Sequence, residues 1–209
     1  PNKTLDIPAT INDQLPRRYT FGAEYSTQEG LSLEGSWLHR NIFGQAERLL
    51  IEGSIGGIGG EVGKTDIDSL LSARLSRPAT FRTDLEAYAL LAFEQVEEEY
   101  YDARTAQLGI GGIYFYSIQT EYRFGLSLKA AKTNDELGTN KYNILIVPIK
   151  DIFDNRNNKL DATSGYYAAI GIEPFLNIAG TKNGVVTTAD LRAYHKVGKN
   201  VTLAIRGLL

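Results

Sequence analysis

Apolar and polar residues alternate along most of the chain from Arg17 onward. The clearest case is Ile118–Lys129, in which apolar residues such as Phe124 and Leu126 are interleaved with charged residues such as Arg123. A repeat of two residues puts one kind of side chain on each face of a β-strand, whereas an α-helix would scatter the same residues around its axis. The pattern therefore predicts an all-β protein whose sheet has one apolar and one polar face.

About eleven such strands are expected, separated by clusters of turn-forming residues. They are Tyr19–Ser26, Leu31–His39, Ala46–Ile55, Ser69–Arg77, Phe81–Val96, Thr105–Tyr116, Ile118–Lys129, Lys141–Ile152, Gly165–Asn177, Gly184–His195 and Asn200–Leu208. Many have roughly 10–14 residues, whereas strands of soluble sheets typically have about 5–6. A strand of the longer kind can cross a bilayer at a tilt.

Two further features favour a membrane β-barrel over a soluble sandwich. Short connections are expected at 41–45, 77–80 and 117, and longer loops at 56–68, 97–104 and 133–140, and outer-membrane barrels have one short and one long end. The polar face also carries ionisable pairs such as Glu121 and Arg123, which suit a water-filled lumen. The predicted fold is a transmembrane antiparallel β-barrel. Since such a barrel must close and bacterial barrels have even strand numbers, we expect the eleven strands to be part of a larger one.

Composition excludes several classes of protein. No stretch reaches the roughly 18 consecutive apolar residues that a membrane-spanning helix needs. The 209 residues include 21 Gly, 12 Tyr and 8 Phe, which suit strands, tight turns and aromatic belts. The absence of Cys excludes disulfides and thiolate metal sites. The formal net charge of −3 gives no case for nucleic-acid binding.

Candidate catalytic and metal-binding residues are few. His39 and His195 fall on different predicted strands without clustered carboxylates, so no metal site is expected. Asp84 and Glu86 share one strand face as a glycosidase pair would, but lumen lining explains them better. The glycine-rich segment 56–60 lacks the Lys and Ser/Thr of a phosphate loop. We expect no enzyme activity and no cofactor.

The acidic run Glu97–Glu99 is predicted to be a solvated loop. A bound calcium ion, or a cation that bridges lipopolysaccharide, is the alternative for this run.

The segment Arg17–Leu49 resembles the first three barrel strands of the bacterial surface-antigen family of outer-membrane insertases, the superfamily that includes BamA and TamA. It has a YST-x-x-G turn at Tyr25–Gly30 and a W-x-HRN-[IL]-FG-x-AERL run at Trp37–Leu49, which is TamA-like. Val201–Gly207 is similar to the strand that precedes the family's inward-folded loop with its VRGY-type motif. That loop is not within these 209 residues.

The segment Asp151–Tyr167 (DIFDNRNNKLDATSGYY) is similar to the family's D-x-R-[DN]…P-T-x-G turn. It departs from that pattern at Asn157, where the family often has Asp, and at Ala162, where it usually has Pro. We expect Arg156 to brace this turn by pairing with Asp154 or Asp161.

The resemblance implies a sixteen-stranded barrel preceded by periplasmic POTRA domains. Residues 1–16 would be the end of a POTRA domain or a linker, and residues 17–209 the N-terminal part of the barrel. It also implies an integral protein of the bacterial outer membrane, in contact with the lipid bilayer. The turn at Asp154–Gly165 would then lie on the periplasmic side.

The resemblance further implies an insertase that adds unfolded outer-membrane protein or autotransporter clients to an exposed strand edge at a lateral gate, with a TamB-like periplasmic partner. The alternatives are a two-partner secretion-type transporter or passive pore of the same superfamily, and a soluble β-domain that binds a ligand. The expected gate-strand residues are Tyr19, Thr20, Gly22, Glu24 and Ser26. The expected structural motif residues are Trp37, His39, Arg40, Asn41, Phe43, Gly44, Asp154, Arg156, Asn157, Asp161 and Gly165.

Overall fold

The computed structural model describes residues 14–60, 67–98, 100–178, 180, 182–198 and 200–209, which form one antiparallel sheet of twelve strands. The strands are β1 (Arg17–Ser26), β2 (Gly30–Arg40), β3 (Arg48–Ile58), β4 (Asp68–Arg77), β5 (Leu85–Glu98), β6 (Tyr101–Phe115), β7 (Thr120–Asp135), β8 (Gly138–Ile146), β9 (Ile149–Asp154), β10 (Gly165–Asn177), β11 (Gly184–Val197) and β12 (Val201–Leu208). Within this described part of the chain, no helix is long and apolar enough to cross a membrane.

β8 and β9 together occupy one position in the sheet, because both lie between β7 and β10. Val147 and Pro148 separate them. The amide of Gly125 donates to the Pro148 carbonyl and the amide of Val147 to the Pro174 carbonyl, each at 3.0 Å. Proline has no N–H for the ladder, so the strand breaks there. The sheet therefore has eleven strand positions, and the predicted strand Lys141–Ile152 is one strand with an interruption.

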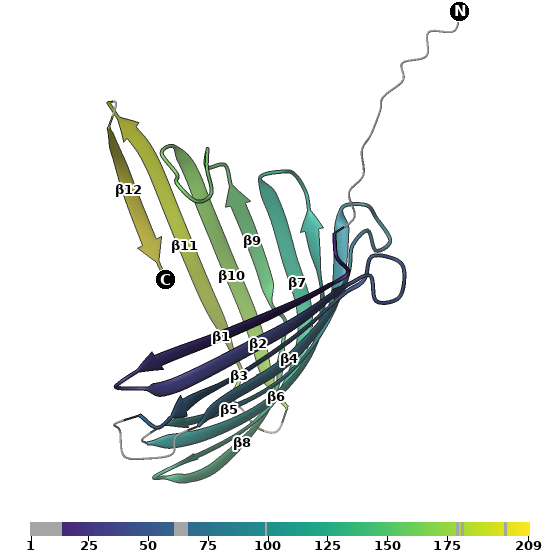
Figure 1. The fold of residues 1–209 in the computed structure, drawn as a ribbon, viewed down its shortest axis with the longest axis vertical. Helices are drawn as coiled ribbons and strands as arrows, with labels where there is room; N and C mark the ends of the chain where they lie inside the picture. Colours follow the sequence, from purple (N-terminus) through teal and green to yellow (C-terminus); the bar gives the residue numbers. More distant parts are fainter. Residues whose placement is uncertain (1–13, 61–66, 99, 179, 181, 199) are drawn as a thin grey trace, which may run out of the picture.

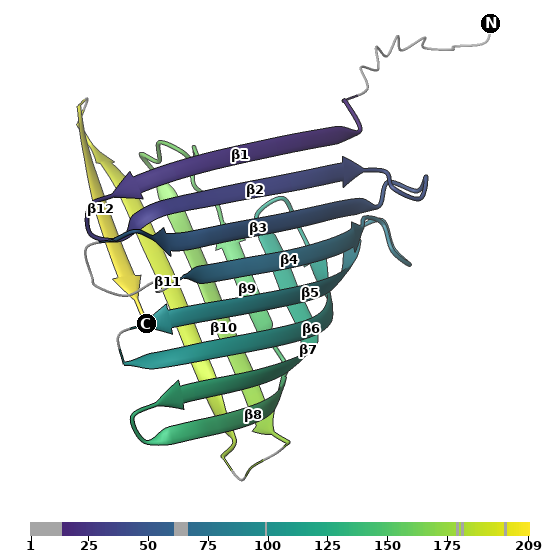
Figure 2. The same cartoon turned by 60° about the horizontal axis from the view of Figure 1, so that its bottom comes forward.

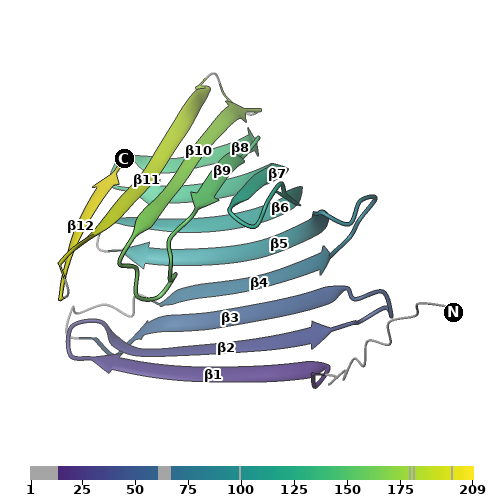
Figure 3. The same ribbon diagram turned by 90° about the horizontal axis from the view of Figure 1, so that it is seen from above.

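The sheet is strongly rolled. Figure 1 shows β10–β12 rising at a steep angle to β1–β6, and Figures 2 and 3 show the two sets of strands crossing. Over the described residues the strand order runs from β1 to β12 and these two strands do not pair with each other. The sheet is thus open, with β1 at one edge and β12 at the other.

The polar face of the sheet is the concave one. On β7 the apolar side chains are exposed, including Leu128 at 49%. On the opposite face of the same strand Ser127 is only 8% exposed, and Glu121 and Lys129 are half-buried. Side chains converge on the inside of a rolled sheet and spread apart on the outside. The more covered, polar face therefore lies inside.

Burial in this sheet is the reverse of that in a soluble globule, where large apolar residues fill the interior. Among the described residues Ala169 is the single buried hydrophobic residue, whereas the buried polar residues are Glu47, Ser76 and Ser127. Large apolar side chains cover the convex face instead. This is the distribution of a barrel with lipid outside and a polar lumen inside.

The predicted alternation of short and long connections is wrong. The segments 97–104 and 133–140, predicted to be loops, belong mostly to long strands. β5 runs to Glu98 and β6 begins at Tyr101, whereas β7 runs to Asp135 and β8 begins at Gly138. The polar residues there extend the hairpins, and an extended hairpin tip is as polar as a loop. Loop length therefore gives no support for the orientation of the sheet.

Other predicted boundaries also differ. The expected strand Phe81–Val96 begins only at Leu85, because Phe81 lies in the preceding turn with a φ of 62°. The expected glycine-rich loop 56–68 falls partly outside the described residues, and β3 runs as far as Ile58. Of the expected segment 1–16, only residues 14–16 are described.

Candidate functional site

The predicted gate strand is the edge strand β1. It pairs with β2 along its whole length, from Arg17 opposite His39 to Ser26 opposite Gly30. Over the described residues its other edge has no partner. Because side chains alternate along a strand, Tyr19 lies on the convex face, where it is 61% exposed. The other predicted gate residues lie on the concave face, and they are Thr20, Gly22, Glu24 and Ser26.

Gly22 has a close neighbour across the strand pair. A Cβ atom at position 22 would clash with Oε1 of Glu34 and lie 2.7 Å from its Cγ. The Glu34 side chain therefore lies over the place that a side chain at position 22 would occupy. The β1–β2 pair consequently lacks one cross-strand side-chain contact, and such contacts are what stabilise a sheet.

Trp37 and His39 lie together on the convex face at the end of β2. Their rings meet edge to face, with centroids 6.1 Å apart. Nε1 of Trp37 and Nδ1 of His39 are buried and have no hydrogen-bond partner among the described residues. Next to them, the Arg40 amide donates to the Pro16 carbonyl at 2.7 Å and Nη1 of Arg40 donates to the Leu15 carbonyl at 2.6 Å. Arg40 thus ties the incoming chain to the end of β2.

The turn between β2 and β3 holds Asn41, Phe43 and Gly44. Asn41 has a φ of 135° and its Oδ1 accepts a hydrogen bond from the Ala46 amide at 2.9 Å. Gly44 has a φ of 95°, with no atom within 4 Å of the place a Cβ would take. Phe43 is exposed at the tip. The carboxylate of the buried residue Glu47 accepts from the Gln45 amide at 2.8 Å. These bonds hold the turn from inside.

Arg156, in the turn between β9 and β10, pairs with Asp154. Nε of Arg156 donates to Oδ1 of Asp154 at 2.9 Å, and Nη2 donates to Oδ2 at 2.8 Å. Both side chains are 11% exposed. Nη1 of Arg156 also reaches the Lys159 carbonyl at 3.3 Å. Asp161 is exposed, and its amide donates to Asn158. Of the two partners considered for Arg156, the structure places Asp154 against it.

Gly165 and Asn157 close the same turn. Gly165 has a φ of 104°, and a Cβ there would lie 2.6 Å from the Asn155 carbonyl oxygen, so the position requires glycine. Oδ1 of Asn157 accepts from the amides of Thr163 and Ser164, each at 3.0 Å. Its Nδ2 donates to Oγ1 of Thr163 at 2.9 Å. An Asp at position 157 could only accept from that hydroxyl.

A network of charged and aromatic side chains extends from this turn across the concave face. The guanidinium carbons of Arg156 and Arg192 each lie 4.9 Å from the centre of the Tyr167 ring. Asp190 accepts two hydrogen bonds from Arg192, at 3.0 and 2.5 Å, and two from Arg206, at 3.1 and 3.0 Å. Sequence reasoning missed Tyr167 and Arg206. The repeat of a D-x-R triplet, at Asp154 and again at Asp190, was a signal that could have found part of this network.

The predicted motifs gather at one end of the sheet but not at one point. β1 begins at the end where β2 turns into β3, and since strands alternate in direction the β9–β10 turn lies at that same end. The strands between β2 and β9 separate the two turns. Across the described residues, no group of three or more His, Asp or Glu side chains could hold a metal ion. What the arrangement offers is an open strand edge, braced turns and a polar concave face.

The comparisons with known proteins agree with this architecture. The family model described as the Omp85 superfamily domain matches residues 41–209. The crystal structure of BamA from Haemophilus ducreyi lacking POTRA domains 1–3 superposes with a TM-score of 0.72 at 16% sequence identity. The match covers 88% of this chain and 38% of the BamA chain. No curated protein matches the chain in sequence.

These findings confirm the predicted superfamily and the predicted all-β barrel fold. The assignment to the TamA branch, the domain boundaries, the roles of the site residues and the lack of enzyme activity stay predictions. The family model spans far more than half of the 209 residues, and the chain therefore belongs to the Omp85 superfamily.

Proposed function

We propose that this chain is part of an outer-membrane assembly factor that inserts β-barrel or autotransporter clients by pairing their strands with the open edge of β1. The observation that carries the proposal is β1 itself. It is a ten-residue strand with one edge that no described residue pairs with, at the end of a rolled sheet whose convex face is apolar.

An open edge in lipid is energetically costly and therefore ready to accept a partner. Each backbone N–H or C=O left unpaired in the hydrocarbon region costs several kcal/mol. An incoming strand that pairs with β1 removes this cost without covalent chemistry or nucleotide hydrolysis. Tyr19, Phe21 and Tyr25 project from the convex face of β1 and would meet lipid beside the client, because they are 61%, 83% and 67% exposed.

Pairing must also be reversible if the client is to leave. Glycine in a strand weakens it, because it contributes no side-chain contacts. This hairpin contains two such glycines. Gly22 lies on β1, and Gly35 lies on β2 opposite Phe21 of β1. We infer a gate strand of moderate strength in an integral outer-membrane protein, with the β2–β3 and β9–β10 turns on the periplasmic side. A TamB-like periplasmic partner belongs to the same proposal.

A disulfide lock on the full-length protein tests the gate. Thr20→Cys would be paired with a cysteine on the last strand of the full-length barrel, and insertion of an unfolded outer-membrane protein into proteoliposomes would be measured. We expect locking to abolish insertion and reductant to restore it. The control is Thr20→Cys with Ser36→Cys, because these positions face each other across β1 and β2. That bond leaves the outer edge of β1 free and should leave insertion unchanged. Normal insertion by the gate-locked form would refute the proposal.

A transporter or passive pore of the same superfamily is the second candidate. The polar concave face favours it, since Glu121, Arg123, Lys129 and Lys150 lie on that face within the middle of the sheet. A gate-locked protein that still conducts ions and exports a dedicated partner would establish a transporter. Loss of both activities on locking would favour the insertase.

A further inference from the structure

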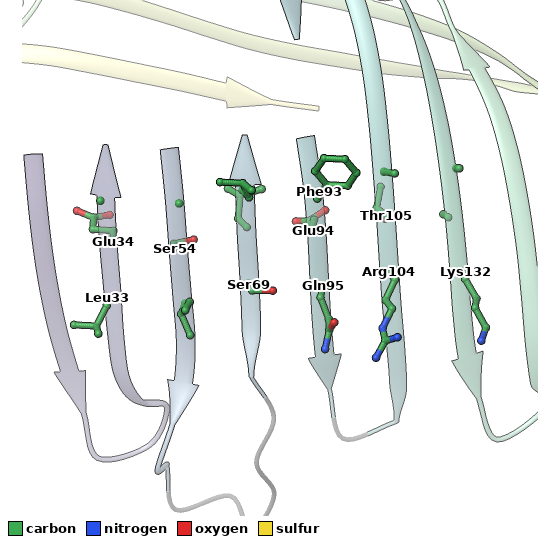
Figure 4. A pocket seen from close by; sticks show the side chains of 18 of the residues that line it. Leu33, Glu34, Ser54, Ser69, Phe93, Glu94, Gln95, Arg104, Thr105 and Lys132 are labelled. Carbon is green, nitrogen blue, oxygen red and sulfur yellow. The ribbon is translucent and has the colours of Figure 1, made fainter. Parts of the chain in front are cut away.

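Three basic side chains lie side by side on the convex face of the sheet. Arg104 on β6 is directly opposite Lys132 on β7, and Lys132 is directly opposite Lys141 on β8. We name these three residues the basic row; Figure 4 shows two of them, Arg104 and Lys132, on adjacent strands. The ion pairs that the described residues form include none of the three. Like charges directly opposite each other destabilise a sheet. A bound anion would offset the repulsion within the basic row.

The carboxylates near the basic row do not neutralise it. Asp102 lies one position further along the same face, and with Asn134, Arg104 and Lys132 it frames a small hollow of about 90 Å³. The carboxylate of Glu97, opposite Asp102, accepts from Nε2 of Gln95 at 2.5 Å and from the Ile67 amide at 3.4 Å. Hydrogen bonds from neutral amides leave the charge of Glu97 in place, so three cations face two carboxylates and the patch still carries net positive charge.

The basic row borders a hollow of about 960 Å³ (Figure 4). Two rows of cross-strand neighbours flank it. One row runs from Leu33 and Ile55 through Gln95 to the basic row, so it changes from apolar to basic. The other row is mostly small or apolar, and its members are Phe21, Gly35, Gly53, Leu71, Phe93, Ala106, Ala130 and Asn143. The hollow thus joins an apolar trough to a cationic end.

The depth of the basic row in a membrane can be estimated from the spacing of residues along β7. Tyr122 packs with Tyr114 and Tyr116, with ring centroids 6.2–6.3 Å apart, as in an interfacial aromatic cluster. Lys132 lies ten residues beyond Tyr122 on the same face. At about 3.4 Å per residue and a tilt of about 35–45°, that distance rises about 24–28 Å, which is close to the height of about 25 Å of a barrel's apolar band. Tyr122 and Lys132 therefore mark the two opposite membrane interfaces.

We propose that the basic row and the adjoining hollow bind a phosphorylated lipid of the outer leaflet. The phosphate lies against Arg104, Lys132 and Lys141, and an acyl chain lies in the trough over Ala106 and Ala130. The inference rests on the proposed membrane barrel and on its proposed orientation, which puts this end of β6–β8 at the cell surface. A phosphate on a lipid carries both the charge and the chain that the two parts of the site fit.

The test measures lipid binding by the full-length protein in detergent. The variant is Arg104→Gln with Lys132→Gln and Lys141→Gln, and the matched control is Lys129→Gln with Lys150→Gln and Lys196→Gln, three cations of the concave face. The probes are lipid A, lipid A without its phosphates, phosphatidylglycerol and inorganic phosphate. Each cation near an anionic lipid surface contributes roughly a fivefold gain in affinity, so removing three should weaken lipid A binding about a hundredfold. The control should bind as the unmodified protein does.

Each outcome decides one element of the proposal. Equal lipid A binding by the variant and the unmodified protein, or equal loss in the control, overturns the site. If inorganic phosphate binds as tightly as lipid A, the ligand need not be a lipid and that part of the proposal is refuted. If phosphatidylglycerol binds more tightly than lipid A, the assignment to an outer-leaflet lipid is refuted. Resistance of reconstituted protein to carbonate extraction is measured separately. If extraction releases the protein, the membrane-barrel proposal itself fails, and the two failures are thus distinguished.

Discussion

Two groups of charged residues in this sheet are satisfied in opposite ways. On the concave face, Asp190 is shared by Arg192 and Arg206, and Asp154 is held by Arg156. We name these residues the concave network. On the convex face, the basic row has three cations and no ion-pair partner among the described residues. The first group is complete by itself, whereas the second requires something from outside the chain.

The difference teaches how to separate a structural charge from a binding charge. A guanidinium that makes two hydrogen bonds to one carboxylate is fixed in direction and charge, and removing either partner leaves the other unsatisfied. Cations that lie side by side without a carboxylate repel one another, and a bound anion relieves that repulsion. Breaking the concave network should therefore lower stability in any medium. Breaking the basic row should change the response to lipid.

The largest effect is expected where the concave network depends on backbone shape. Gly165→Ala places a Cβ 2.6 Å from the Asn155 carbonyl oxygen at a φ of 104°, so the turn that holds Arg156 must shift. We expect a loss of about 3–4 kcal/mol in the free energy of unfolding of the full-length protein, from the urea midpoint. Gly44→Ala is the control, since Gly44 has a φ of 95° with no atom within 4 Å. A similar loss in both variants would show that backbone strain alone, not the clash, sets the cost.

An intermediate effect is expected at the ion pair itself. Arg156→Ala leaves the Asp154 carboxylate, which is 11% exposed, without its cation, and should cost about 2–3 kcal/mol. Arg82→Ala is a close control, because Arg82 binds Asp84 through the same pair of nitrogens and lies 5.3 Å from the Tyr114 ring. Its pair is more exposed, at 63% and 31%, so water screens the pair and the loss of unfolding free energy should be clearly smaller than for Arg156→Ala. The stability of both variants is measured as the temperature at which the folded band is lost on heat-modifiability gels. Equal losses would mean that burial does not distinguish the two pairs.

The smallest effect is expected from Asp190→Asn. This substitution leaves neighbouring cations of the concave network without a carboxylate, as in the basic row. Arg192 and Arg206 would then face each other without a carboxylate, although both remain 28–52% accessible to water. We expect a loss of unfolding free energy smaller than that of Arg156→Ala, and reduced when phosphate is added. Unfolding is measured in sulfate-free buffer with and without phosphate. A loss that phosphate does not change would show that uncompensated arginines alone do not make an anion site.

Much of the fold could be predicted because it depends on neighbouring residues. A two-residue repeat is local, and it correctly indicated eleven strand positions and their apolar and polar faces. The break at Pro148 was missed because the alternation on either side of it continues. The hairpin tips near Glu98 and Asp135 are not distinguishable from loops in the sequence, since both are polar.

The candidate site was less predictable, because its contacts depend on register. Arg156 and Asp154 are two residues apart at one turn, so Asp154 could be predicted as one of two partners, with Asp161 as the other. Arg206 lies sixteen residues from Asp190, and only the β11–β12 register brings them together. The basic row is assembled by two successive hairpins. A sequence without known strand pairing gives no reason to group three such distant cations.

The interruption at Val147–Pro148 has a mechanical consequence. β9 pairs with β10 over six positions, but β8 pairs with β10 over only three. Pro148 donates no backbone hydrogen bond to this ladder, so the pairing between β7 and β10 is shared by two short strands. We therefore expect bending of the sheet to concentrate at Val147–Pro148 rather than within the continuous ladders on either side.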